Sequence, residues 1–209
     1  QGRTSMRNLM IALAGILVAW SGADAREPEL SKPAPDFAAT DTKGAAVKLS
    51  DFKGKLVILE WSNHQCPYVR KHYGSGNMQK TQAAARELGV VWLTIISSAP
   101  GEQGHVNAAE ADKLTAERNA KPVHVLLDPK GQIGRLYGAK VTPHMFIIGT
   151  DGNLLYKGAI DSIRSSRVAD IEKAKNYVTA ALGEIKAGTK VTDTDTAAYG
   201  CTIHYKEGS

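Results

Sequence analysis

The sequence has few aromatic residues, only two cysteines and no block of like charges. Aromatic residues make up 6% of the 209 residues, and the net charge of +5 is scattered along the chain. Without a basic stripe or a clustered basic motif, the sequence gives no sign of nucleic-acid binding. Beyond the N-terminal region, no apolar run approaches the length that spans a bilayer. Nucleic-acid binding and stable membrane insertion of the mature chain are therefore not expected.

The first residues have the features of an export signal. A short basic start precedes an apolar run over residues 9–20, and Ala23 and Ala25 are small residues at the positions that a signal peptidase recognises. The run is too short for a comfortable membrane span, although an uncleaved N-terminal anchor is the alternative. We therefore expect a leader at residues 1–25 that is cleaved after Ala25. Residues 26–209 would then form one domain of a bacterial protein that is periplasmic or secreted.

Two cysteines in a chain of this length favour redox chemistry over structural cross-linking. Cys66 and Cys201 are far apart in the sequence, and an exported protein enters an oxidising compartment in which they could pair. A domain of about 180 residues buries enough apolar surface to be stable without such a cross-link. We therefore expect the cysteines to react, although a purely structural disulfide that includes Cys66 is the alternative.

Cys66 lies at the junction of a predicted strand and a predicted helix. The apolar run at 56–61 is typical of a buried strand. Proline is favoured at the first position of a helix, so Pro67 places Cys66 at or near the N-cap. Free amide groups and the positive end of the helix dipole stabilise an anion there. Because the thiolate is the reactive form of cysteine, Cys66 is the candidate nucleophile.

The other periodic segments predict an α/β protein. Turn residues at 41–44 between two short strand patterns indicate an N-terminal β-hairpin. Strands that alternate with helices and close on an antiparallel hairpin around 150–153 indicate a mixed central sheet with helices on both faces. Further strands are expected at 90–96, 123–127, 144–148 and 154–157, and helices from 67, at 77–88, 107–119, 133–137 and 167–187.

Several separate motifs, in order along the chain, resemble the peroxiredoxin-like redoxins of the alkyl hydroperoxide reductase/thiol-specific antioxidant (AhpC/TSA) family in the thioredoxin-like superfamily. The similarity extends from about Pro35 to Lys206. The motifs that carry it are residues 63–69, 137–139, 142–143, 156–161 and 199–203.

The resemblance implies a thioredoxin-like fold and an oxidoreductase that uses neither a cofactor nor a metal ion. It also implies a cis peptide bond before Pro143, close to the reactive sulfur; proline is the residue for which a cis bond costs little. The substrate face that it implies around the sulfur of Cys66 consists of Asn63, His64, Pro67, Thr142 and Pro143.

Two positions depart from the family pattern. Thioredoxins carry a second cysteine three residues after the first, where this chain has Val69. A mixed disulfide on Cys66 therefore has no neighbouring thiol to resolve it. Typical peroxiredoxins carry threonine three residues before the reactive cysteine, where this chain has Asn63. Asparagine can still donate and accept hydrogen bonds.

Cys201 is the candidate resolving thiol. It lies in a polar C-terminal tail at residues 188–209, and roughly a dozen extended residues could span ~40 Å. We therefore expect Cys66 to attack a hydroperoxide and become a sulfenic acid, and Cys201 to condense with it to a disulfide. A thioredoxin-like electron donor would then restore both thiols.

Two alternatives to peroxide reduction remain open at this point. One is thiol–disulfide exchange with partner proteins, in which the substrate is a disulfide. The other belongs to a different class: non-enzymatic copper binding or a docking module. It is suggested by His64 near Cys66 and by His144 directly after Pro143.

Overall fold

A computed structural model describes residues 27–206 of the chain. The export signal expected at residues 1–25, with its cleavage site, lies outside this range. Among the described residues, no helix has both the length and the apolar composition needed to cross a membrane.

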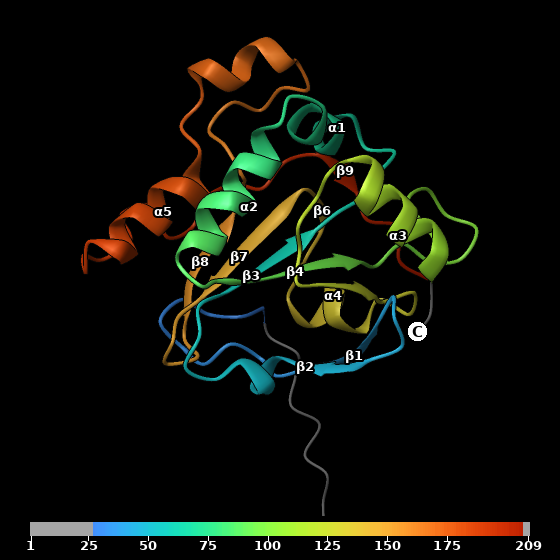
Figure 1. The fold of residues 1–209 in the computed structure, drawn as a ribbon, viewed down its shortest axis with the longest axis horizontal. Helices are drawn as coiled ribbons and strands as arrows, with labels where there is room; N and C mark the ends of the chain where they lie inside the picture. Colours follow the sequence, from blue (N-terminus) through green and yellow to red (C-terminus); the bar gives the residue numbers. More distant parts are fainter. Residues whose placement is uncertain (1–26, 207–209) are drawn as a thin grey trace, which may run out of the picture.

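A seven-stranded mixed sheet forms the centre of the structure (Figure 1). Its strands lie in the order β2-β1-β5-β4-β3-β7-β8. β3, β4 and β5 are parallel, whereas β1 is antiparallel to β2 and β5, and β7 is antiparallel to β3 and β8. The strands are β1 (Ala38–Asp41), β2 (Ala46–Lys48), β3 (Val57–Trp61), β4 (Val91–Ile96), β5 (His124–Leu127), β7 (His144–Ile148) and β8 (Leu154–Gly158). Beside this sheet, β6 (Val141–Thr142) pairs with β9 (Cys201–Thr202).

The composition of β3 explains its central place. All five of its residues are buried. Leu59 and Trp61 belong to the apolar cluster on one face of the sheet, and Ile58 belongs to the cluster on the other face, which also contains Cys66. A strand covered on both faces has apolar side chains on both sides of its pleat. Glu60 is the polar exception in β3.

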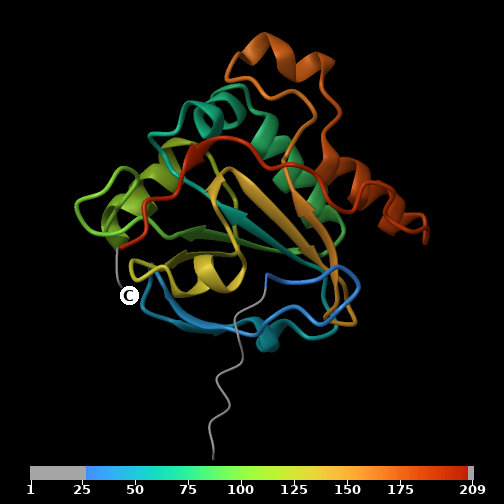
Figure 2. The same ribbon diagram turned by 180° about the vertical axis from the view of Figure 1, so that it is seen from behind.

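Helices lie on both faces of the sheet, which confirms the predicted α/β fold with its N-terminal hairpin (Figures 1 and 2). One face is covered by the three helices α1, α2 and α5, and α3 packs beside them against β5. On the other face, α4 and η1 pack in one apolar cluster with residues of the sheet's own strands, including Val47 of β2. The helices are η1 (Leu49–Phe52), α1 (Pro67–Gly74), α2 (Asn77–Glu87), α3 (Ala108–Glu117), α4 (Gln132–Leu136), η2 (Val168–Lys173) and α5 (Tyr177–Lys186).

The prediction of a single long helix at 167–187 is wrong. The segment forms the 3₁₀ helix η2 and then, after a break, α5. Asn176 is the N-cap of α5, and its Oδ1 accepts a hydrogen bond from Thr179 N at 3.0 Å. A capped N-terminus starts a new helix. The apolar spacing continues across the break, which is why periodicity alone predicts one helix.

The C-terminal segment is bound to the rest of the protein along its described length. Backbone hydrogen bonds join it to β8 (Lys157 N to Thr194 O, 2.9 Å) and to the start of β6 (Ile203 N to Lys140 O, 3.0 Å). Tyr199 is buried within it. Figure 2 shows this segment, in red, crossing the molecule in front of the sheet. The sequence predicts a tail that reaches across the surface to find Cys66, but β9 already lies beside the loop that precedes β7.

Candidate active site

Cys66 is the N-cap of α1, as its sequence predicts. Its backbone is extended (φ −68°, ψ 122°), and Pro67 occupies the start of the helix. Cys66 has no exposed surface (0%). Its protonated Sγ donates a hydrogen bond to Thr142 O at 3.1 Å. When the proton leaves, the unpaired amides of the first helical turn can stabilise the charge on the sulfur.

The loop before β7 has the predicted cis peptide bond, between Thr142 and Pro143. This bond lies at the end of β6, and the carbonyl of Thr142 faces Cys66. On its other side, Thr142 is paired with Cys201 in the β6-β9 ladder. One residue of the cis-proline loop therefore contacts both cysteine-bearing segments.

The structure brings the two cysteines together as free thiols. Burial raises the pKa of the Cys201 thiol to about 12, and the neighbouring Cys66 adds to the increase. Cys201 packs against the apolar cluster that contains Cys66, so the two cysteines lie in the same part of the molecule.

Gly200 allows β9 to approach the cis-proline loop. Its φ is +144°, and a Cβ at this position would lie 1.8 Å from Thr142 O. Any side chain would therefore collide with the backbone that Cys201 pairs with. Gly200 directly precedes β9, and a glycine at such a position is typical of a close backbone approach.

The remaining residues of the expected substrate face have different environments. Pro67 is exposed at the start of α1. Thr142 is buried under β9. His64 is partly exposed and lines a cavity of about 320 Å³ together with residues of α3. Burial and the charge of Arg118 lower the pKa of His64, with Glu110 opposing them, so the imidazole is neutral at pH 7.

Asn63 is held within the loop between β3 and α1. It is 2% exposed. Its Oδ1 accepts a hydrogen bond from Gln65 N at 2.8 Å, and its Nδ2 donates to Gln103 O at 3.5 Å. Gly104 packs so closely against this amide that a Cβ there would lie 2.3 Å from Asn63 Cγ. The side-chain amide thus joins two loops.

A buried ion pair lies on the far side of α1 from its N-cap. Lys71 Nζ is 2.8 Å from Asp161 Oδ2, and the two residues are 2% and 3% exposed. The hydroxyl of Tyr199 donates a hydrogen bond to the same carboxylate. This cluster ties α1 to the segment that follows β8 and to the residue two positions before Cys201.

Replacing Lys71 by Met is expected to reduce the free energy of unfolding by about 3–5 kcal/mol, because it leaves the Asp161 carboxylate buried without its cation. Urea unfolding followed by circular dichroism measures the change. Lys113→Met is the control: Lys113 is 75% exposed and 3.8 Å from Glu117, so its loss should cost less than about 0.5 kcal/mol. A cost below about 1 kcal/mol for Lys71→Met would contradict the importance of the pair.

His72 makes stability depend on pH. Burial lowers its pKa from 6.5 to about 4, although the Asp161 carboxylate, 3.7 Å from its Nε2, opposes the shift. The unfolded chain therefore binds a proton between pH 6.5 and 4 that the folded chain does not. The stabilisation is complete above pH 6.5 and is lost as the pH falls toward 4.

Between pH 7 and pH 5, this residue should lower the free energy of unfolding by about 2 kcal/mol. The measurement is urea unfolding at both pH values for the wild type and for His72→Gln. The variant should show a pH dependence that is smaller by that amount. Equal pH dependence in the two proteins would contradict the assignment.

A second buried carboxylate, that of Glu60, lies in β3 beneath α1. It is 0% exposed and accepts hydrogen bonds from Tyr73 Oη (2.9 Å), Trp92 Nε1 (2.9 Å) and Thr94 Oγ1 (3.0 Å). Burial, followed by the charge of Glu60, raises the pKa of Tyr73. These bonds satisfy the carboxylate and fix α1 over the sheet.

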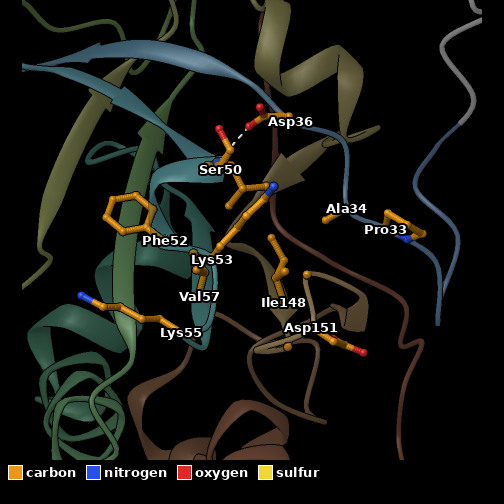
Figure 3. Close-up of a pocket in the computed structure, with 13 residues that line it drawn as sticks. Pro33, Ala34, Asp36, Ser50, Phe52, Lys53, Lys55, Val57, Ile148 and Asp151 are labelled. Atoms are coloured by element: carbon orange, nitrogen blue, oxygen red, sulfur yellow. Dashed lines mark hydrogen bonds between the residues drawn. The ribbon is translucent and has the colours of Figure 1, made fainter.

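A separate cavity of about 270 Å³ lies at the opposite end of the sheet (Figure 3). It is located where β3 begins at Val57 and β7 ends at Ile148, and Lys53 and Lys55 lie at its edge. The full length of β3 separates it from the loop that carries Cys66. Its lining contains no cysteine, so it is not part of the thiol site.

A helix-capping cysteine facing a cis-proline loop, in a sheet of this topology, defines the thioredoxin-like class of proteins. The family model of the AhpC/TSA family matches residues 30–157. The chain therefore belongs to the AhpC/TSA family, whose members are thiol-dependent oxidoreductases, and the resemblance inferred from the motifs is confirmed.

Individual proteins show the same relationship. Thiol-disulfide oxidoreductase ResA from Bacillus thuringiensis is 28% identical over 130 residues, which cover 61% of this chain and 68% of the relative. A structure described as a thiol:disulfide interchange protein, DsbE, from Chlorobium tepidum is 31% identical with a TM-score of 0.52, covering 63% of this chain and 85% of that one. An uncharacterized conserved protein from Geobacillus kaustophilus shares the fold, with a TM-score of 0.72, 22% identity, and coverage of 87% and 94%.

Sequence reasoning finds the two cysteines but misses the residues that hold them in place. Asp161 and Tyr199 lie within the family-like motifs at 156–161 and 199–203, which by themselves assign them no role. Lys71 has the pattern of an ordinary surface residue of a helix. The signal that could have identified Lys71 is its position five residues after Cys66, together with the carboxylate of Asp161 in the motif at 156–161.

Proposed function

We propose that the protein is a thiol–disulfide oxidoreductase that alternates between the Cys66/Cys201 dithiol and an intramolecular disulfide of the same two residues. The observation that carries this proposal is the position of both cysteines at the cis-proline loop, where Cys66 Sγ donates a hydrogen bond to Thr142 O and Cys201 pairs with Thr142 in the β6-β9 ladder. A disulfide between Cys66 and Cys201 would join two segments that both already contact Thr142. Cys201 would thus provide the second redox-active thiol, which the chain lacks at position 69.

The reaction balances as a two-electron exchange. Oxidation of the two thiols forms one S–S bond and releases two protons and two electrons to a disulfide, which becomes two thiols. The reverse reaction consumes two protons and two electrons. The partner is thus a protein disulfide or a thioredoxin-like dithiol donor, and no cofactor is needed. The names of the relatives ResA and DsbE support exchange as the reaction.

Hydroperoxide reduction, the reaction expected from the sequence, is the second candidate. Membership of the AhpC/TSA family favours it. The geometry supports it less well, because a peroxide must reach Cys66, which is 0% exposed. In addition, the Asn63 amide that would replace the peroxidase threonine is bonded to Gln65 and Gln103.

Copper binding is less well supported than either reaction. Among residues 27–206, no group of three or more His, Cys, Asp or Glu side chains is placed to hold a metal ion. Burial lowers the pKa of His144 to about 4.

We further propose that the reaction takes place outside the cytoplasm, where the expected signal at residues 1–25 would direct the chain.

The experiment compares two substrates with the wild-type protein and dithiothreitol as electron source. Reduction of insulin disulfides, followed by turbidity, reports exchange. Consumption of hydrogen peroxide reports peroxidase activity. We expect catalysis in the first assay at a rate well above that of dithiothreitol alone. Fast peroxide consumption without insulin reduction would favour the second candidate and overturn the proposal.

A further inference from the structure

The cavity of about 320 Å³ that His64 lines lies directly beside the segment that leads into Cys66. Gln65, the residue before Cys66, lines it as well, and neighbouring Cα atoms are only about 3.8 Å apart. The opposite wall is α3, which contributes residues 110, 113, 114 and 117. Residues three, four and seven apart share one face of a helix. A polypeptide that reacts at the cysteines therefore has this cavity next to it.

The polar groups in the cavity are mainly hydrogen-bond acceptors. Glu110 and Glu117 lie two turns apart on α3. Glu110 Oε2 accepts a hydrogen bond from Asn107 N at 2.8 Å, and no described residue donates to its Oε1. His105 Nδ1 is 3.1 Å from Ser98 O. Because a carbonyl only accepts, Nδ1 carries the hydrogen, and Nε2 of the neutral ring is an acceptor.

The cations near the cavity do not neutralise these carboxylates firmly. Lys113 is 75% exposed and lies 3.8 Å from Glu117; such a surface pair contributes little, and the lysine can turn into solvent. The guanidinium of Arg118 lies 4.3 Å from the centre of the Tyr73 ring, so its charge has another partner. The imidazole of His64 is neutral at pH 7, because burial and Arg118 lower its pKa.

We propose that this cavity binds a basic side chain, arginine or lysine, of the partner protein whose disulfide is exchanged. The inference rests on the exchange function proposed above and names the class of its substrate. Val106 and Leu114 belong to one apolar cluster, on which the aliphatic part of such a side chain can pack. The charged end is received by Glu110, Glu117 and the acceptor nitrogen of His105.

The dimensions of the site set the position of this basic residue in the partner. An extended chain covers roughly 3.3 Å per residue. The two glutamates are seven residues apart on α3, which is roughly 10 Å along the helix. The partner's arginine or lysine should therefore lie about two to four residues from its reacting cysteine.

The test uses the full chain, reduced and freed of dithiothreitol, and short alanine-based peptides whose single cysteine carries thionitrobenzoate as a mixed disulfide. The two protein thiols are oxidised to one disulfide, and the peptide disulfide is reduced to a peptide thiol and thionitrobenzoate. The absorbance of thionitrobenzoate gives the rate. Each peptide carries one arginine, glutamate or citrulline, the uncharged analogue of arginine, at the positions given above.

We expect the best arginine peptide to react at least about tenfold faster than its citrulline counterpart, which corresponds to one hydrogen bond to a charged group. The glutamate peptide should react more slowly still. The net charge of the protein, +5, would by itself favour the acidic peptide. A preference for arginine therefore reports the cavity rather than the overall charge.

The double variant Glu110→Gln/Glu117→Gln should reduce the ratio of the arginine rate to the citrulline rate to within about twofold. Glutamine at 110 can still accept the hydrogen bond of the capping box. The matched control is Asp112→Asn/Glu87→Gln, which removes the same charge from residues of α3 and α2 that do not line the cavity. The control should keep the wild-type ratio.

The failure of this inference differs from the failure of the exchange function. Equal rates for the arginine and citrulline peptides at every position would overturn the inference alone. A preference for arginine that persists in Glu110→Gln/Glu117→Gln would do the same. A product without the Cys66–Cys201 disulfide, identified by its mass after alkylation, would overturn the exchange function and this inference with it.

Discussion

Cys201→Ser is expected to lower the rate of catalysed insulin reduction by about 100-fold or more. Residues that act as a unit are not additive, so the loss of one costs about as much as the loss of both. Without Cys201, the protein has no dithiol that can donate two electrons and close to an internal disulfide. Cys66→Ser should lower the rate equally, for the same reason. The insulin turbidity assay with dithiothreitol measures both variants.

The matched control for this prediction is Thr202→Ser, the next residue of β9, whose side chain is exposed. It should retain wild-type activity, since it alters the same strand without removing a thiol. Near-normal turnover by Cys201→Ser would show that Cys66 works alone, and the paired-thiol mechanism would then be wrong.

Gly200→Ala is expected to slow formation of the Cys66–Cys201 disulfide by about 100-fold, because misplacing reacting groups by about 1 Å costs a factor of this size. The new Cβ would lie 1.8 Å from Thr142 O, on a backbone with φ +144°. β9 must therefore move away from β6, and Cys201 moves with it. Diamide oxidation, stopped at intervals by alkylation and analysed by mass, gives the rate.

Gly188→Ala controls for the conformational cost of replacing a glycine. Gly188 also has a positive φ, +70°, but nothing lies within 4 Å of the position that a Cβ would occupy there. The variant should lose roughly 1–2 kcal/mol of stability, the cost of a Cβ in the left-handed region, while closing the disulfide at the wild-type rate. Unchanged closure in Gly200→Ala would show that the β6-β9 contact does not position Cys201.

Local signals in the sequence are sufficient for the centre of the site. Pro67 determines where α1 begins and so places Cys66 at the N-cap. The apolar run of β3 and the turn residues of the N-terminal hairpin predict the sheet. The cis bond before Pro143 follows from the family resemblance. Each of these features depends on residues close together in the chain or on a motif.

Long-range contacts cannot be predicted in the same way. The polar C-terminal segment has no periodic pattern, and its position depends on a ladder with two residues of β6 and on the absence of a side chain at Gly200. The Lys71–Asp161 pair joins helix α1 to the segment that follows β8. Nothing local distinguishes a lysine that will be buried from one that will be solvated, because its partner is supplied by the fold.

The mass of the alkylated protein before and after reduction tests most directly whether the two thiols act as a pair. After diamide treatment, we expect a monomer that takes up no alkyl group and weighs two hydrogens less than the dithiol form. Dithiothreitol should then restore a protein that takes up an alkyl group at both Cys66 and Cys201. If both thiols were still alkylated after oxidation, or if Cys66 gained oxygen while Cys201 stayed free, the two residues would not form the proposed redox pair.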